Sequence, residues 1–310
     1  MHFLFLLSVH LCFSFYINYQ TKGTLKTITL ITHDGHFHAD EIFATAIGLL
    51  YAEAFQYQTK IVRTRDADRI SAVKNKSNAV WTIDVGGTFD PDTNDFDHHQ
   101  DKDLACSCVM LWQYKGGSLL KAKAYGAEKC HAIYNGVFKK LSGIDYFDRG
   151  IADAHDKWYK SEFSQNGVMH LNQLIREMNH HSTDSEKEQN SRFEVLVLLA
   201  KEMLKNWMET AALRWDMAND PQAFVLQEGD AWMSLKQPMP NWRSLFPKKE
   251  MICFRTGNQF CVQYRPAVRQ KLQQLKVNAQ HIPDRGLLYC TSEAELKQVI
   301  NCFQGKKETA

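Results

Sequence analysis

The chain lacks most of the compositional signals that would assign it to a specialised class of protein. Its eight cysteines are scattered over 310 residues and none forms a Cys-x-x-Cys pair, which argues against a disulfide scaffold and a structural zinc ribbon. With Gly 16 and Pro 7, the chain is no low-complexity linker protein. The net charge is only +2, so any contact with nucleic acid must come from a local basic patch.

Long apolar runs are also missing, apart from one near the start. The run Phe3–Ile17 is shorter than the roughly 20 residues of a transmembrane helix. No basic region precedes it, and no Ala-x-Ala-like cleavage site follows, although a signal peptide remains open. We treat residues 1–25 as an apolar extension outside the fold, and we expect a cytoplasmic protein without stable membrane association.

The remaining pattern predicts an α/β fold. Apolar, β-branched runs occur within Leu25–Gly35, Thr59–Asp66 and Asn78–Gly87, and helical spacing follows the first of them over residues 40–55. Buried strands that alternate with helices are typical of a parallel sheet with helices on both faces. Ligands of such sheets gather at the carboxyl ends of the strands.

A second, smaller α+β domain is expected towards the C-terminus. The polar stretch at residues 179–190 marks the best boundary, and a long amphipathic helix follows at roughly Ser191–Met217. Short strand-like runs come after this helix. We therefore predict a metal-binding catalytic domain over residues 26–182, and a linking helix with a substrate domain over residues 183–310.

Four polar clusters fall at or near the predicted strand ends, and their side chains suit metal binding. Imidazole and carboxylate ligands without thiolates are typical of catalytic manganese, magnesium, iron or zinc. Two such ions about 3.5–4 Å apart need roughly six to eight ligands. The chain offers His33, His38, Asp40, Asp84, Asp97, His98, His99 and Asp156. Each cluster alone is better explained as a turn or cap, but together they favour a metal centre; His36 is expected to face solvent.

The same residues carry a resemblance to a known family. The triplet Asp97-His98-His99 resembles the motif that names the DHH phosphoesterase superfamily. The wider series resembles the melanocyte-proliferating-gene family within it, from about Thr27 to Tyr289. This series consists of His33-Asp-Gly-x-Phe-His38-x-Asp40-Glu41, Arg63-Thr-Arg-Asp66, Asp84-Val-Gly-Gly and Asp97-His-His-Gln100.

The resemblance implies a two-domain, metal-dependent phosphoesterase. Characterised members of the family are 3′-to-5′ exonucleases acting on RNA, associated in eukaryotes with nucleus and mitochondria. The metal ligands that the resemblance implies are His33, His38, Asp40, Asp84, His98 and Asp156. Asp97, His98 and His99 are the predicted catalytic residues; Asp97 and His99 would orient the ligands or protonate the leaving oxygen. The family's fourth motif ends Asp-Asn-Gly, whereas Lys157 and Trp158 follow Asp156, so Asp153 is an alternative ligand.

Three functions fit these residues. The first is hydrolysis of single-stranded RNA at two divalent ions between the domains, with Mn²⁺ preferred and Mg²⁺ as the alternative. The second is hydrolysis of a small phosphoester, such as a short oligonucleotide, a cyclic dinucleotide or pyrophosphate, which the near-neutral charge fits equally well. The third is a metal-binding scaffold without turnover.

Arginines are the expected phosphate ligands of either enzyme, because their guanidinium groups bind phosphate oxygens in pairs. The predicted substrate-binding residues are Arg63, Arg65 and Arg265, with Arg149 and Arg269 as further candidates. The sequence leaves open whether the protein is a homodimer.

Overall fold

The computed structural model describes most of the chain, as two compact units. The described residues are 26–77, 79–148, 171–179, 185–220, 222, 224–239, 242–268, 270, 280–282 and 286–304. The first unit contains the described residues up to Tyr125 and those from Val137 to Lys205, and the second contains Gly126–Gly136 and those from Asn206 onward. Each unit is described by itself below.

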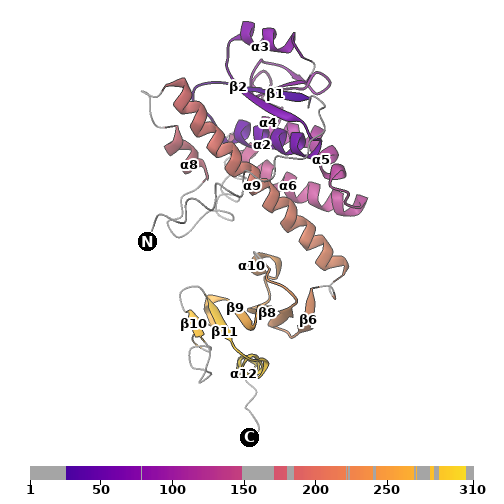
Figure 1. Cartoon of the computed structure of the whole chain (residues 1–310), viewed down its shortest axis with the longest axis vertical. Helices are drawn as coiled ribbons and strands as arrows, with labels where there is room; N and C mark the ends of the chain where they lie inside the picture. The colour runs from indigo at the N-terminus through magenta and orange to yellow at the C-terminus, as the bar shows by residue number, and fades with distance from the viewer. Residues whose placement is uncertain are drawn as a thin grey trace, which may run out of the picture. The chain divides into compact units, whose positions relative to one another are not determined.

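The first unit is built on a five-stranded sheet with the strand order β2-β1-β3-β5-β4 (Figure 1). The strands are β1 (Thr27–Thr32), β2 (Gln58–Arg63), β3 (Val80–Ile83), β4 (Phe89–Asp90) and β5 (Asp95–Phe96). Strand β1 pairs in parallel with β2 and β3, and β3 pairs in parallel with β5. Only β4 is antiparallel, at the edge. The predicted parallel sheet is therefore confirmed.

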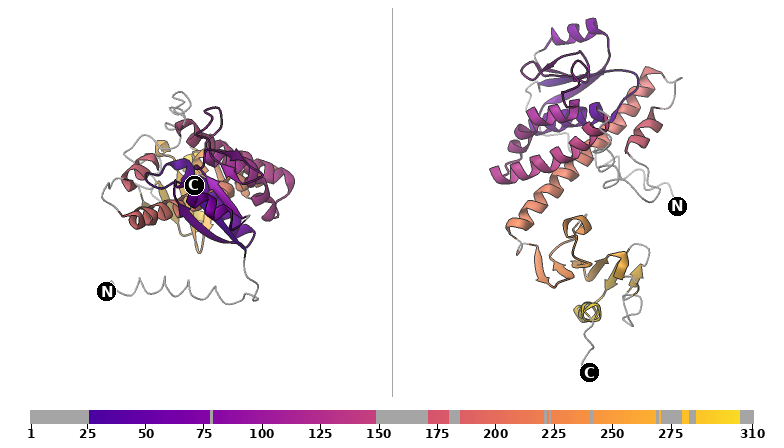
Figure 2. Two further views of the ribbon diagram at one scale, coloured as in Figure 1. Left: turned by 90° about the horizontal axis from the view of Figure 1, so that it is seen from above. Right: turned by 180° about the vertical axis from the view of Figure 1, so that it is seen from behind.

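Helices cover both faces of this sheet, because successive residues of a buried strand point to opposite sides. The helical elements are α2 (Ala39–Ala54), α3 (Ala67–Lys74), α4 (Ser107–Leu111), the π-turn η1 (Trp112–Gly116), α5 (Gly117–Ala122) and α8 (Leu171–Met178), with the part of α6 (Ala127–Asp148) from Val137 onward. Leu30 packs against Gly48 of α2, where a Cβ would come within 2.9 Å of the leucine methyl groups. Its neighbour Ile31 packs with Ile70 of α3. Figures 1 and 2 show α2 and α3 on opposite sides of the sheet.

The long helix α9 (Glu186–Asn219) belongs to both units. Its first part contacts the first unit through the ring of Phe193 on Phe37 and an ion pair of 2.8 Å between Lys201 and Glu53. Its last part contacts Lys129 of α6 through Asp216, at 2.7 Å. The division between the units falls within α9, after Lys205, and within α6, after Gly136. Neither α9 nor any other described helix is long and apolar enough to cross a membrane.

The second unit contains a six-stranded sheet with the order β10-β11-β9-β8-β7-β6. Its elements are β6 (Val225–Glu228), β7 (Trp232–Leu235), α10 (Trp242–Leu245), β8 (Met251–Thr256), β9 (Gln259–Tyr264), the 3₁₀ turn η3 (Pro266–Val268), β10 (Gln280–Ile282), β11 (Leu287–Cys290) and α12 (Glu293–Phe303). All pairs are antiparallel except β7 with β8. Cys253 faces a core that includes Val299 of α12, and Ile252 faces a core that includes Trp242. This is the expected α+β domain.

The packing of β1 on α2 predicts a large loss of stability for Leu30→Ala. Leu30 is fully buried, so the truncation removes packed methyl groups and leaves a cavity, with an expected loss of about 2–5 kcal/mol. The matched control is Leu198→Ala at an exposed position of α9, where we expect a change of about 0.5 kcal/mol or less. Urea unfolding followed by circular dichroism measures both, and equal losses would contradict the packing described here.

Candidate metal centre

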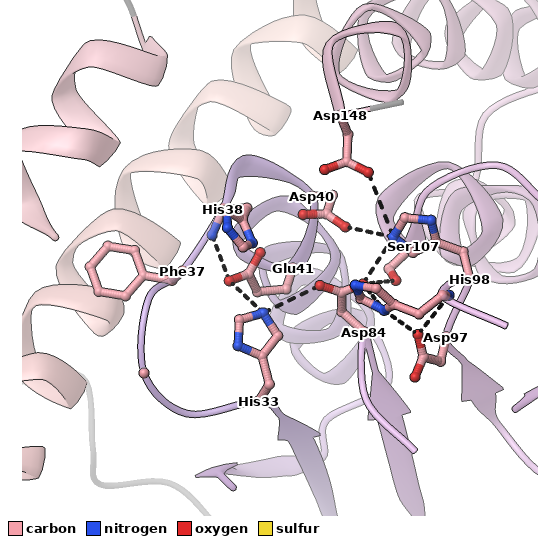
Figure 3. A network of polar contacts seen from close by, with 12 residues as sticks. His33, Phe37, His38, Asp40, Glu41, Asp84, Asp97, His98, Ser107 and Asp148 are labelled. Atoms are coloured by element: carbon pink, nitrogen blue, oxygen red, sulfur yellow. Dashed lines mark hydrogen bonds and ion pairs between the residues drawn. The ribbon is translucent and has the colours of Figure 1, made fainter. Parts of the chain in front are cut away.

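Four of the predicted site residues directly follow strands of the first sheet. His33 follows β1, Asp84 follows β3, and Asp97 with His98 follows β5. Because these three strands are parallel, their carboxyl ends meet at one edge of the sheet, where side chains from distant parts of the chain converge. Figure 3 shows this convergence, with α2 and α6 adding residues from the side.

Asp84 lies at the centre of the cluster. Its backbone has a left-handed φ of 59°, which aspartate adopts more readily than most residues. One carboxylate oxygen, Oδ2, lies 3.3 Å from Nε2 of His33, and the other, Oδ1, lies 3.1 Å from Nε2 of His98. The backbone N–H of Asp84 donates to the carbonyl of Phe96 at 3.0 Å. Asp84 therefore joins the ends of two strands and both imidazoles.

The two glycines after Asp84 bring Asp97 into the cluster. Gly86 and Gly87 have φ values of 103° and 66°, a backbone region that side chains with a Cβ rarely adopt. The N–H of Gly87 donates to Oδ2 of Asp97 at 2.6 Å. Oδ1 of Asp97 accepts the backbone N–H of His99 at 3.1 Å and its ring Nδ1 at 2.7 Å. The Asp-Val-Gly-Gly turn thus fixes Asp97, which in turn orients His99.

The start of α2 supplies a second set of donors. Oε1 of Glu41 lies 3.1 Å from Nε2 of His33 and accepts the backbone N–H of His38 at 2.6 Å. The rings of His33 and His38 lie 5.7 Å apart, measured between centroids. Glu41 and its neighbour Asp40 are both buried. A buried acidic pair at a helix N-terminus is favoured by the helix dipole, but needs further positive partners.

A third set forms around His98. Its Nε2 lies 3.4 Å from Oδ2 of Asp40 and 3.6 Å from Oδ2 of Asp148, the last residue of α6. The ring of His98 therefore faces three carboxylates, those of Asp40, Asp84 and Asp148 (Figure 3). Such a concentration of like charge is costly to bury unless a cation balances it.

Protons on the histidines supply this balance when no other cation is bound. Burial lowers the pKa of His33, but its hydrogen bonds to Asp84 and Glu41 outweigh burial and raise the pKa to about 10. His98 behaves in the same way, and its bonds to Asp40 and Asp84 raise its pKa to about 10. Burial would raise the pKa of Asp84, yet the two histidines hold it far below its usual range. At neutral pH both imidazoles are therefore cationic.

Even two imidazolium groups leave negative charge without a partner. Burial, reinforced by the charge of Asp84, raises the pKa of Asp40 well above its usual value. Burial also raises the pKa of Asp148, in spite of the nearby His98. Oδ1 of Asp40 and Oε2 of Glu41 are buried and accept no hydrogen bond from the described residues. Buried polar atoms of this kind call for a further partner, and a metal ion is one that fits.

The donor atoms form three overlapping groups, each within 4.8 Å. The groups are His33, His38, Glu41 and Asp84; then Asp84, His98 and His99; then Asp40, His98 and Asp148. Asp84 belongs to the first two groups, and His98 to the last two. Nitrogen and carboxylate donors without sulfur suit Mn²⁺, Mg²⁺, Zn²⁺ or iron. Both the donor set and the unpartnered oxygens therefore fit divalent metal ions.

Two candidate donors of this cluster were not predicted from the sequence. Glu41 stands beside the predicted ligand Asp40, and only the fold shows that its carboxylate reaches His33. Asp148 precedes Arg149 and Gly150 in the sequence. This Asp-x-Gly pattern matches the ending expected for the fourth motif better than Asp156 does. Asp156 and its alternative Asp153 lie outside the described residues, as do Arg149 and Arg269.

The three predicted substrate arginines have different surroundings. Arg63 is buried, and its guanidinium donates to the carbonyl groups of His33 at 3.1 Å and Gly35 at 2.8 Å. These contacts support the loop that carries His33. Arg65 is exposed and donates to the carbonyl of Asp34, at the rim of the same loop. More than half of its side-chain surface is exposed to solvent.

Arg265 lies in the second unit. Its guanidinium donates to the carbonyl groups of Lys249 at 2.7 Å and Phe246 at 3.1 Å, and it lies over the ring of Trp242. These contacts hold the segment after α10 against β9. In the first unit, His36 is exposed, as expected, and belongs to none of the three donor groups.

The fold and the cluster define an α/β protein with a histidine–carboxylate centre at the carboxyl edge of a parallel sheet. Residues 29–281 match the model of the MYG1 exonuclease family, described as Uncharacterised protein family (UPF0160). Because the match covers most of the chain, this protein belongs to that family.

Relatives in other organisms match over shorter segments. The chain is 39% identical to the human MYG1 exonuclease over 134 residues, which cover 42% of this chain and 32% of the human protein. It is 33% identical to the MYG1 protein of Chlamydia pneumoniae over 119 residues, which cover 38% of this chain and 37% of the relative. The matches thus span less than half the length of these relatives.

Solved structures show only a distant likeness. The pGpG-specific phosphodiesterase of Vibrio cholerae is 12% identical, with a TM-score of 0.28, covering 91% of this chain and 98% of its own. RecJ of Thermus thermophilus, in complex with Mn²⁺, is 10% identical, with a TM-score of 0.26, covering 89% of this chain and 52% of its own. TM-scores this low support no functional conclusion.

The raised histidine pKa values predict that metal binding releases protons. His33 and His98 are cationic at neutral pH, with pKa values of about 10, and an imidazole must lose its proton before it can coordinate a metal. We expect about two protons or more to be released per chain on saturation with Mn²⁺ at pH 7, because Asp40, whose pKa is also raised, must lose any proton that it holds. The affinity is expected to fall as the pH is lowered. Calorimetry in buffers of different ionisation enthalpy measures this number.

Two matched histidine variants sharpen the test. His33→Gln is expected to release about one proton fewer, whereas His36→Gln, at the exposed position outside the donor groups, is expected to match the wild type. Mn²⁺ binding without proton release would show that the two imidazoles do not take part.

Proposed function

We propose that this chain is a metal-dependent phosphodiesterase that removes nucleotides from the 3′ end of single-stranded RNA. The observation that carries the proposal is the Asp84 carboxylate, which lies between His33 and His98 and belongs to two overlapping groups of metal donors. Membership of the MYG1 exonuclease family supports the same activity. Neither observation alone specifies RNA, which is the substrate implied by the resemblance of the motifs.

The proposed cofactor is a pair of divalent ions, Mn²⁺ or Mg²⁺. Shared carboxylates are typical of sites that hold two ions close together. His33, His38, Glu41 and Asp84 would hold one ion, and Asp84, Asp40, His98 and Asp148 the other. Ions bound there would activate a water molecule and neutralise charge on the phosphate oxygens. The protein's own contribution is to hold these donors, of which His33, Asp40, Glu41 and Asp84 are buried, in a preorganised arrangement.

His99 is the proposed proton donor to the leaving oxygen. Its Nδ1 is held by Asp97 at 2.7 Å, and 61% of its side-chain surface is exposed. The contact with Asp97 fixes the ring and leaves Nε2 available for the substrate. His99 thus differs from His33 and His98, whose rings are turned towards buried carboxylates.

Binding of the phosphate chain is assigned to exposed arginines. Arg65 lies at the rim of the His33 loop with its side chain 56% exposed, whereas buried Arg63 supports that loop from below. The small net charge of +2 favours a short substrate as much as a long polyanion. A small phosphoester is therefore the second candidate, at the same centre.

Hydrolysis of single-stranded RNA, about 30 nucleotides long and labelled at its 5′ end, tests the proposal. With Mn²⁺ present, we expect a ladder that shortens from the 3′ end. Asp84→Asn keeps the shape of the side chain but removes the charge that both donor groups share; we expect it to lower the rate about 100-fold or more. His36→Gln is the matched control and is expected to cut at the wild-type rate. Internal cuts, or hydrolysis by Asp84→Asn at the wild-type rate, would contradict the proposal.

Substrate length separates the two candidate enzymes. Rates on dinucleotides to pentanucleotides are compared with rates on the long RNA over a range of salt concentrations. A long substrate bound through several phosphates loses affinity steeply with salt. Fast hydrolysis of the short substrates alone would support the small phosphoester. Tight Mn²⁺ binding without hydrolysis of any substrate would support a metal-binding scaffold without catalytic activity.

A further inference from the structure

Ser107 is a buried polar side chain that neither the motifs nor the donor groups include. It is fully buried, and its Oγ lies 2.9 Å from Oδ1 of Asp84 and 2.9 Å from the carbonyl oxygen of Phe96. Figure 3 shows Ser107 beside Asp84, on the side of His98. We infer that Ser107 is a positioning residue of the metal centre, which acts by holding the Asp84 carboxylate; this inference rests on the proposed function of that centre.

The hydroxyl group of Ser107 donates its hydrogen to the carboxylate of Asp84 rather than to the carbonyl of Phe96. Ser107 has one hydrogen to donate, and the carbonyl of Phe96 already accepts the backbone N–H of Asp84 at 3.0 Å. A hydrogen bond to a charged acceptor is stronger than one to a neutral carbonyl. Ser107 therefore donates to Oδ1, the oxygen that also faces His98 at 3.1 Å.

The orientation of the Asp84 carboxylate matters for both of the donor groups that include it. The backbone of Asp84 is left-handed, with a φ of 59°. One oxygen of its carboxylate contacts His33, and the other contacts His98. A rotation of this carboxylate would weaken two donor groups at once, because both include Asp84. Among the described residues, Ser107 supplies the side-chain hydrogen bond to Asp84 that comes from outside the donor groups.

Ser107 is itself anchored to the element that carries Asp148. It is the first residue of α4, and the N–H of the preceding Cys106 donates to Oδ1 of buried Asp145 at 2.7 Å. Asp145 and Asp148 are three residues apart on α6 and share a face of that helix. The position of α6 therefore determines the position of Asp148 directly. It also affects the orientation of Asp84, because the start of α4 is bonded to Asp145 and Ser107 contacts Asp84. This link coordinates donors from two sides of the cluster.

Mn²⁺ titration of the metal-free full-length chain by calorimetry tests the role of Ser107. Loss of an outer hydrogen bond to a metal ligand commonly weakens metal binding by a factor of 10 to 100, so we expect Ser107→Ala to weaken Mn²⁺ binding by about tenfold or more. Ser142→Ala is the matched control, because Ser142 lies outside the donor groups and its hydroxyl donates to the carbonyl of Phe138 within α6; we expect wild-type affinity. Ser107→Thr retains the hydroxyl group and is expected to restore binding to within about threefold of the wild type.

The outcomes separate this inference from the proposed function. The inference is overturned if Ser107→Ala binds Mn²⁺ as tightly as the wild type, or if Ser107→Thr binds as weakly as Ser107→Ala. If the metal-free Ser107→Ala protein unfolds at a thermal midpoint close to that of Ser142→Ala, the effect is local to the centre. A much lower midpoint, together with failure of Ser107→Thr to restore Mn²⁺ binding, supports a merely structural role. Mn²⁺ binding without RNA hydrolysis by the wild type would contradict the proposed function alone.

Discussion

Asp84 places one carboxylate between the buried His33 and the partly buried His98, and the rest of the centre depends on these contacts. Its two oxygens lie 3.3 Å from His33 and 3.1 Å from His98. At such separations charges attract or repel by several kcal/mol in a partly buried site. The surrounding acids Asp40, Glu41 and Asp148 repel Asp84 and one another, so the arrangement requires positive charge in its middle. Protons on the histidines supply part of this positive charge. The oxygens of Asp40 and Glu41 that have no hydrogen-bond partner indicate where bound cations would supply the rest.

The scaffold makes this crowded arrangement possible by holding the acids on separate elements. Asp84 and Asp97 stand at strand ends, Asp40 and Glu41 in the first turn of α2, and Asp148 at the end of α6. Each element is fixed by apolar packing elsewhere, as in the contact of Leu30 with Gly48. The repulsion at the edge is therefore opposed by burial of the apolar core, which is the dominant stabilising contribution to folding. A centre of this kind is preorganised, because its ligands cannot move apart without disturbing the packing.

The two roles of histidine follow from surroundings rather than from residue type. His33 and His98 face buried carboxylates and are suited to hold a cation in place of their protons. His99, next in the chain after His98, is exposed and is held by Asp97. The two rings lie side by side, 4.7 Å apart between centroids. They differ in exposure and in bonding partner, which is why His98 is a candidate metal donor and His99 the proposed proton donor. The two arginines also differ in their surroundings. Arg63 supports the His33 loop, whereas the side chain of Arg65 is exposed.

Much of this could be predicted from local patterns. The β-branched runs determine the parallel strands, and the polar residues after them, His33, Asp84, Asp97 and His98, must meet at one edge because strands of a parallel sheet end on the same side. The Gly86-Gly87 pair is likewise readable as a turn with positive φ. Glu41, Asp148 and Ser107 could not be recognised in this way, because their roles depend on which helix packs beside the strand ends. The tertiary structure decides which helix packs there. The positions of α6 and of the start of α4 depend on packing between segments that are distant in sequence, and a local sequence pattern does not specify such packing.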